Sequence, residues 1–136
     1  MTPRFTRRRI GATVLLAALA ASALAHGPTR QKATEKITID APAAAVWAKI
    51  SNFDALKDWH PAVAESPADN GNHEGSVRQV KLKAGGELRE KLEKYDDAQM
   101  RYSYRAKDGG ALPVTNYTST IQVSAEGSTS VVEWRG

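Results

Sequence analysis

The alternation of apolar and polar residues divides much of the chain into short elements. Residues 32–40 alternate with a period of two, which predicts a half-buried strand with Ala33, Ile37 and Ile39 on its apolar side. Residues 43–50 instead repeat their apolar positions at intervals of three and four, which predicts a helix buried on one side. That side comprises Ala43, Val46, Trp47 and Ile50.

A second helix and a loop are predicted next. Asn52 is placed to cap a short helix over residues 53–59, and Pro61 ends it because proline cannot continue a helix. Residues 62–75 are interrupted by proline, Asn-Gly and glycine, so we expect a loop there.

The remainder of the chain repeats strand patterns separated by turn residues, which predicts an antiparallel meander. The predicted strands are 76–83, 87–95, 100–106, 114–124 and 129–135. Together with the strand before the helices, they make a sheet of about six strands. The fold class is therefore α+β, with two short helices inserted after the first strand.

Arg78 and Glu90 are two charges on a face that is otherwise apolar. A three-residue loop at 84–86 would place both on that face as diagonal neighbours, because side chains alternate along a strand. The loop would pair Leu82 with Leu88, Val80 with Glu90, and Arg78 with Leu92. Burial of one charge alone is costly, so we expect an ion pair. It is either a polar anchor in a ligand cavity or a structural pair that sets the strand register.

Several aromatic residues are also candidates for a binding site. Tyr102 and Tyr104 share one face of their strand, and Tyr117 and Trp134 lie on the last two strands. A buried tyrosine needs a partner for its hydroxyl group, so these residues either line a pocket or form an ordinary aromatic core. Trp47, on the apolar face of the first helix, is expected in the core.

Trp59 and His60 end the second predicted helix. His60 is either a proton donor or ligand contact, or a helix-ending residue that bonds a free carbonyl group.

The first 25 residues have the pattern of an export signal. A basic segment with four arginines precedes an apolar run over residues 11–23, and Ala23 and Ala25 fit a signal peptidase site. The run is short for a membrane span, although a retained anchor is the alternative. We therefore expect a periplasmic domain over residues 26–136, exported by the Sec route or, given Arg7–Arg9, by the twin-arginine route.

The charge balance changes once this leader is removed. The sequence has 19 Lys and Arg residues, and the leader holds four of them and no acidic residue, which leaves as many basic groups as the 15 acidic ones. This balance gives no reason to expect binding to nucleic acid or to an acidic membrane. The chain has no cysteine, so its core alone must stabilise it.

No arrangement of residues typical of catalysis is present. The sequence contains no GxSxG or HExxH motif and no phosphate-binding glycine loop, and we predict no catalytic residue, cofactor or metal ligand. One alternative is copper bound by the α-amine and imidazole of an N-terminal His26, with His60 or His73 completing the site. Another is general acid–base catalysis by His60 or Glu90.

The order of elements over residues 37–61, ITIDAPAAAVWAKISNFDALKDWHP, is unusual: a strand, a sharp turn and two small helices, followed only by strands. It resembles the opening of the helix-grip fold in the START/Bet v 1-like superfamily, also called SRPBCC or polyketide cyclase/dehydrase-like. The resemblance implies a curved sheet wrapped around a cavity, with Trp59 and His60 at its mouth. In this superfamily a long C-terminal helix normally crosses the concave face. The sequence ends at Gly136 with the last strand, so we expect a C-terminally incomplete domain with an uncovered, association-prone apolar face.

Shorter segments resemble a narrower group, the MxaD-like periplasmic proteins. They are residues 26–32, 112–117 and 132–136, together with Trp59-His60-Pro61. Such proteins are associated with methanol dehydrogenase and its cytochrome acceptor as helpers, not as catalysts.

The leading expectation is a periplasmic, non-catalytic protein that binds a small apolar molecule in a cavity. The expected ligand-binding residues are Trp59, His60, Arg78, Glu90, Tyr102, Tyr104, Tyr117 and Trp134. The alternatives are an MxaD-like accessory protein for a periplasmic redox enzyme and a cyclase- or dehydratase-like enzyme.

Overall fold

The computed structural model describes residues 30–136, so the predicted signal peptide and His26 lie outside the described residues. Residues 32–136 form one compact unit. Its elements are β1 (Thr34–Ile39), α1 (Ala43–Ile50), the 3₁₀ helix η1 (Phe53–Ala55), α2 (Leu56–Trp59), β2 (Val63–Glu65), β3 (Val77–Leu82), β4 (Glu87–Asp96), β5 (Arg101–Asp108), β6 (Thr115–Glu126) and β7 (Thr129–Arg135).

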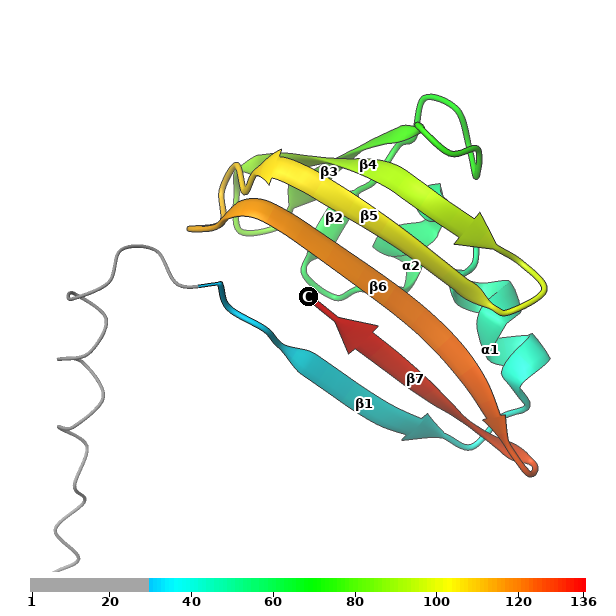
Figure 1. The fold of residues 1–136 in the computed structure, drawn as a ribbon. Coiled ribbons are helices and arrows are strands. Elements are labelled where there is room, and N and C mark those ends of the chain that lie inside the picture. The colour runs from blue at the N-terminus through cyan, green and yellow to red at the C-terminus, as the bar shows by residue number, and fades with distance from the viewer. Residues whose placement is uncertain (1–29) are drawn as a thin grey trace, which may run out of the picture. The chain divides into compact units, whose positions relative to one another are not determined.

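The strands form a single antiparallel sheet in the order β1-β7-β6-β5-β4-β3-β2. The sheet is curved, and α1 and α2 lie against one of its faces (Figure 1), which we call the inner face. The other face, which the helices do not cover, is the outer face. This is the helix-grip arrangement that the order of elements predicted.

The sheet has seven strands, where the sequence pattern predicted about six. The additional strand, β2, lies within the segment that was expected to be a loop, and it pairs with the edge of β3. β2 is only three residues long, and Val63 is its one buried side chain, 3 % exposed. Such a short run carries no measurable period, so it could not be distinguished from a loop.

The predicted register of β3 and β4 is wrong by two residues. Arg78 pairs directly with Glu90, and Val80 pairs with Leu88, because the chain turns earlier than expected. Gly85 and Gly86 adopt φ angles of 98° and 84°, which side chains disfavour, and the amide of Leu82 donates to the carbonyl of Gly86 at 3.0 Å. A shift of two residues preserves the side-chain alternation, so the predicted face is correct.

β1 was expected to be half-buried but is largely exposed. It is an edge strand that pairs only with β7. Ile37 remains 61 % exposed on the inner face, opposite Val132, while Ile39 packs against the core. The alternating pattern correctly indicated a strand, but it cannot tell whether another element covers the apolar side.

The first helix buries the four residues predicted for it. Trp47 belongs to the core, as expected, and its indole N–H donates to Asp97 at 2.7 Å. The second predicted helix is divided into η1 and α2.

Asn52 does not cap the second helical segment, contrary to the prediction. The amide of Phe53 instead donates to the side-chain oxygen of Asn72, at 2.8 Å, and the Asn72 side chain also donates to that of Asn52, at 3.1 Å. A residue nineteen positions away performs the cap.

Candidate ligand-binding site on the inner face

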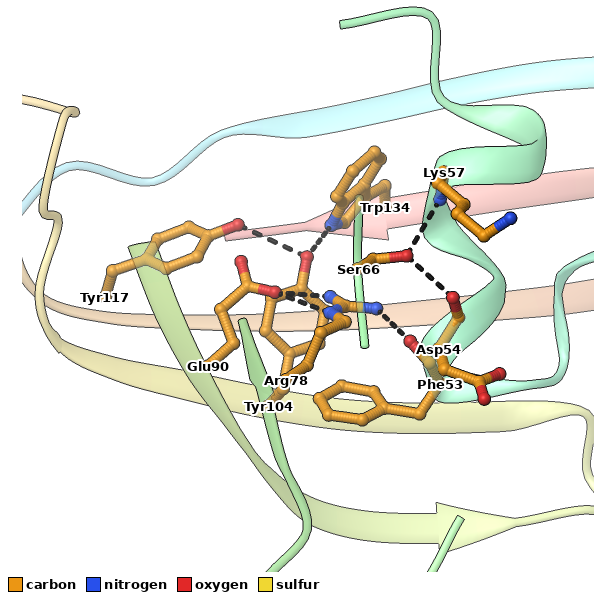
Figure 2. A network of polar contacts seen from close by, with 9 residues as sticks. All are labelled: Phe53, Asp54, Lys57, Ser66, Arg78, Glu90, Tyr104, Tyr117 and Trp134. Carbon is orange, nitrogen blue, oxygen red and sulfur yellow. Dashed lines mark hydrogen bonds and ion pairs between the residues drawn. The ribbon is translucent and has the colours of Figure 1, made fainter. Parts of the chain in front are cut away.

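The structural centre of the site is the buried pair of Arg78 on β3 and Glu90 on β4. The Arg78 side chain has no exposed surface and that of Glu90 is 5 % exposed. Both Nε, at 3.0 Å, and Nη2 of Arg78 donate to the same carboxylate oxygen, Oε2 of Glu90. Nη1 donates to the backbone carbonyl of Phe53 at 2.8 Å, as Figure 2 shows. The guanidinium group therefore ties η1 to the sheet.

Two aromatic rings enclose this guanidinium group. Its central carbon lies 4.1 Å from the ring centre of Phe53 and 4.9 Å from that of Tyr104, both within range of a cation–π interaction. Burial alone would lower the Arg78 pKa, but the attraction of Glu90, supported by Tyr102 and Tyr104, outweighs it and raises that pKa. Arg78 is thus permanently charged and fully enclosed. It organises the site and offers no surface to a ligand.

Beside this pair, three side chains of the inner face form a chain of hydrogen bonds. The indole N–H of Trp134 donates to the hydroxyl oxygen of Tyr104 at 3.1 Å. The Tyr104 hydroxyl lies 3.3 Å from that of Tyr117 (Figure 2). Tyr104 is 1 % exposed, and burial is the main reason that its pKa lies well above 10. Its hydroxyl group therefore remains protonated at neutral pH.

Trp59 and His60 complete the site from the end of α2. The Trp134 ring lies 5.8 Å from both the Trp59 ring and the His60 ring, in edge-to-face arrangements. All three side chains are partly exposed, so they are accessible from solvent. These contacts place the predicted Trp-His motif beside the predicted aromatic residues of the sheet.

His60 does not bond a free carbonyl through its ring, one of the two roles considered for it. Its Nδ1 accepts the amide N–H of Ala62 at 3.2 Å, while its own amide ends the helix by donating to the carbonyl of Leu56 at 2.8 Å. Burial lowers the His60 pKa, and Arg78 adds to the decrease while Glu90 opposes it. A neutral ring agrees with an Nδ1 that accepts a hydrogen bond.

Tyr102 is the predicted site residue that lies deepest. It is 1 % exposed and its ring stacks on Tyr95, with an interplanar angle of 13°, and also contacts Trp47 and Phe53. It belongs to the core that supports the site. The structure brings the other seven together: Trp59, His60, Arg78, Glu90, Tyr104, Tyr117 and Trp134.

Two groups that position the site were not identified from the sequence. One is the Phe53 carbonyl, since a backbone acceptor leaves no sequence signal. The other is Ser66, 1 % exposed, whose hydroxyl donates to the carbonyl of Asp54 at 2.6 Å and accepts the amide of Lys57 at 3.0 Å (Figure 2). Ser66 thereby holds the junction of η1 and α2. A serine beside a proline in a loop gave no indication of this role.

Metal binding and membrane insertion each require a specific structural feature. Among the side chains that the structure describes, those of residues 30–106 and 109–136, no three His, Asp or Glu groups gather as a metal site would require. His26, on which the copper hypothesis depends, lies outside the described residues. No helix in the same range has the length and apolar character needed to span a bilayer.

The family described as polyketide cyclase / dehydrase and lipid transport matches residues 30–136. The chain belongs to this family, and with it to the Bet v 1-like, or SRPBCC, superfamily that the order of its elements resembled.

Solved structures agree with this assignment. The protein XoxI from Bacillus cereus is 34 % identical, with a TM-score of 0.70, over 78 % of this chain and 73 % of that one. An uncharacterised protein from Bacillus thuringiensis is also 34 % identical, with a TM-score of 0.69, over 77 % and 75 % of the two chains. The Zhui aromatase/cyclase from Streptomyces sp. R1128 shares the fold, with a TM-score of 0.66 at 13 % identity, over 77 % and 65 %. No curated protein matches the chain.

Proposed function

We propose that this protein is an exported helix-grip protein that binds a small apolar molecule on the inner face of its sheet, without catalysing a reaction. The observation that carries the proposal is the aromatic cluster of Trp59, His60, Tyr117 and Trp134, which is partly exposed beside a buried ion pair. Ligand sites combine mostly apolar walls with a few placed polar groups, and this cluster has that composition.

The surroundings of the cluster support this proposal. Helices α1 and α2 lie behind only part of the sheet (Figure 1). Among residues 30–136, the large apolar side chains that remain exposed are Ile37, at 61 %, Leu112, at 41 %, and Val114, at 40 %. Exposed apolar surface beside an aromatic cluster is typical of a region that binds an apolar partner.

The two candidate acid–base groups are occupied by structural contacts. Glu90 is paired with Arg78, and Nδ1 of His60 accepts a backbone N–H. Each contact gives its group a structural role, which agrees with a binding protein. Export to the periplasm rests on the leader sequence over residues 1–25.

Native mass spectrometry tests the proposal. The protein is purified without denaturation from the periplasm of its own host and should carry a reproducible additional mass. Trp134→Ala should lose that mass, because the indole group is the centre of the aromatic cluster. Arg105→Ala, a substitution on the outer face, should retain it. A bare mass for the unsubstituted protein would contradict the binding role, and recovery of the protein only from the cytoplasm would contradict export.

A second function, an MxaD-like accessory protein for a periplasmic redox enzyme, is favoured by the outer face. Basic side chains from three strands, β4, β5 and β7, point to this face: Arg89, Lys91, Lys94, Arg101, Arg105 and Arg135. Lys91 and Arg105 are direct cross-strand partners, an arrangement of like charges that weakens a sheet. Such a surface suits an acidic protein partner.

This second function makes a different prediction about the two faces. Lys91→Glu should abolish salt-sensitive capture of an acidic periplasmic enzyme, whereas Trp134→Ala should leave it intact. Capture that depends on Trp134 and not on Lys91 would contradict the accessory role of the outer face.

A further inference from the structure

Asn70 and Gly71 belong to an exposed turn between β2 and β3 that the proposed binding function does not use. Among the four asparagines of the chain, only Asn70 precedes a glycine. Both residues are exposed, and the carbonyl group of Asn70 accepts the amide N–H of His73 at 3.2 Å, which closes the turn. Gly71 adopts a φ angle of 55°, a conformation that glycine reaches at little cost.

Two groups of this turn are free to react with each other. The backbone amide of Asn70 donates to the hydroxyl oxygen of Ser76 at 3.1 Å, but its side-chain amide has no hydrogen-bond partner among the described residues. The same is true of the backbone N–H of Gly71. Apart from its chain neighbours, no atom lies within 4 Å of the position where a side chain at residue 71 would begin. The Gly71 nitrogen therefore has unhindered access to the side-chain carbon of Asn70.

The other asparagines lack this combination. Asn52, Asn72 and Asn116 are each followed by a residue with a large ring, which obstructs an attack by the next backbone nitrogen. Asn72 is also fixed by its contacts: its side-chain oxygen accepts the amide N–H of Phe53 at 2.8 Å, and its side-chain nitrogen donates to Asn52 at 3.1 Å. These three asparagines are therefore internal controls for the reactivity of Asn70.

We propose that the Asn70–Gly71 turn is a site of spontaneous covalent modification, at which the asparagine becomes isoaspartate. The Gly71 nitrogen, after losing its proton to water, attacks the side-chain carbonyl carbon of Asn70. A C–N bond forms, and the side-chain amide group takes a proton from water and leaves as ammonia. Water then opens the resulting five-membered succinimide ring, at the main-chain carbonyl to give isoaspartate or at the side-chain carbonyl to give aspartate. The reaction consumes one water molecule, releases one ammonia molecule and needs no other reactant.

Isoaspartate changes the path of the backbone as well as the charge. The chain then continues through the former side chain, which adds one carbon atom to the main chain at residue 70. The former main-chain carbonyl group becomes a free carboxylate. Because that carbonyl group accepts the amide N–H of His73, the turn loses its closing hydrogen bond. The segment that follows is thereby displaced.

The turn is connected to the buried ion pair through Asn72. This side chain caps η1 by accepting the amide N–H of Phe53, and the Phe53 carbonyl group accepts a hydrogen bond from Arg78. The Phe53 ring also covers the guanidinium group, 4.1 Å from its central carbon. A longer main chain two residues before Asn72 moves the cap away from the Phe53 amide. The modification therefore loosens η1, the helix that encloses Arg78.

Timed incubation followed by peptide mapping tests the reaction. The purified full chain is held folded at neutral and at alkaline pH, and its fragments are analysed by mass spectrometry and by methylation with an isoaspartyl methyltransferase. Residue 70 should gain the mass difference between amide and acid and become a methylation substrate, faster at alkaline pH because the attacking nitrogen must lose its proton. Asn52, Asn72 and Asn116 should remain unchanged. An intact Asn70, or equal conversion of Asn72, overturns the proposal.

A matched variant tests the connection to η1. Asn70→Gln keeps the amide group but would have to form a six-membered ring, which closes far more slowly, so the incubated variant should stay unmodified. The incubated unsubstituted chain should melt about 5 °C lower than the variant, the loss expected for one helix cap, and the NMR signal of the Phe53 amide should shift. Isoaspartate without either change overturns the link to η1. No readout involves a ligand, so the outcome is independent of the proposed binding function.

Discussion

Two Arg–Glu pairs use the same strand, β4, and have opposite properties. Arg78 and Glu90 face inward, with side chains 0 % and 5 % exposed. Arg105 on β5 and Glu93 face outward, 2.5 Å apart, with side chains 59 % and 34 % exposed. Their chemistry is identical and their positions differ by only a few residues along β4. The difference between them therefore reports what burial does to an ion pair.

Because the inner pair is buried, losing one partner is costly, although the intact pair adds little net stability to the fold. Each buried charge loses its hydration, and the mutual attraction and the bond to the Phe53 carbonyl offset that loss. Removing one partner leaves the other uncompensated. When one partner of the outer pair is removed, the other remains exposed, and water replaces the lost contact. The inner pair can thus define a site, and the outer pair is free to vary.

The largest expected effect is that of Arg78→Ala. It leaves Glu90 buried without a partner and releases η1 from the sheet, so the free energy of unfolding should fall by about 3–5 kcal/mol. Denaturant unfolding measures this change. The double substitution Arg78→Met with Glu90→Leu removes both charges and should recover much of the loss. No recovery would mean that the contact with Phe53, and not the charge pairing, is decisive.

A smaller loss is expected for Tyr104→Phe. The substitution keeps the ring over Arg78 but removes the acceptor of the Trp134 indole N–H, which costs about 1–3 kcal/mol when the donor stays buried. Thermal unfolding should show it. Ser103→Ala, on the outer face of the same strand, is the control and should change little. Equal effects of the two substitutions would show that the hydroxyl chain contributes nothing to the stability of the fold.

Alkaline pH should act through the same tyrosine. Burial raises the pKa of Tyr104 well above its usual value of 10.0, so its protonated form stabilises the folded state below that pH. This contribution is lost as the pH rises above about 10, where the unfolded chain ionises first. Tyr104→Phe should have a shallower loss of stability between pH 9 and 11. If stability fell equally steeply with pH in the variant, Tyr104 would not be the source of the effect.

Acid should have a weaker effect through His60. Its pKa lies below the usual 6.5, chiefly because of burial, so the unfolded chain binds the proton more readily. Stability is complete above the unfolded-state value and declines as the pH falls below it. His60→Asn should reduce this decline between pH 7 and 5. Melting temperatures across that range test the direction of this effect. A steeper decline in the variant would contradict the lowered His60 pKa.

The smallest effect is expected for the outer pair. Arg105→Ala should change the free energy of unfolding by no more than about 1 kcal/mol, and added salt should reduce the difference further. A loss as large as that of Arg78→Ala would remove the contrast between the two faces.

Much of the fold could be predicted from local patterns. The two-residue period correctly put Arg78 and Glu90 on one face, and the intervals of three and four correctly identified the buried side of α1. Both follow from the geometry of a single element. The register of β3 and β4 was wrong because it depends on where the chain turns, and either of two turns satisfies the same alternation.

The other differences between prediction and structure involve contacts between residues that are distant in the sequence. The cap of η1 comes from Asn72 and not from Asn52, and β2 forms only because β3 offers it an edge. Ile37 is exposed because β1 lies at the edge of the sheet. None of these outcomes is visible in a local window, since each depends on which distant segment arrives beside it.

The amino-acid sequence by itself predicted the order of the helices and of six strands, the family, and the shared face of Arg78 and Glu90. The order and the shared face depend on backbone geometry over a few residues. Only the tertiary structure decided that Arg78 meets the Phe53 carbonyl across 25 positions and that Trp134 donates to Tyr104 across 30. The curvature and register of the whole sheet bring such groups within bonding distance. Those contacts turned seven of the eight candidate residues into an ion pair, a hydrogen-bonded hydroxyl chain and an aromatic surface.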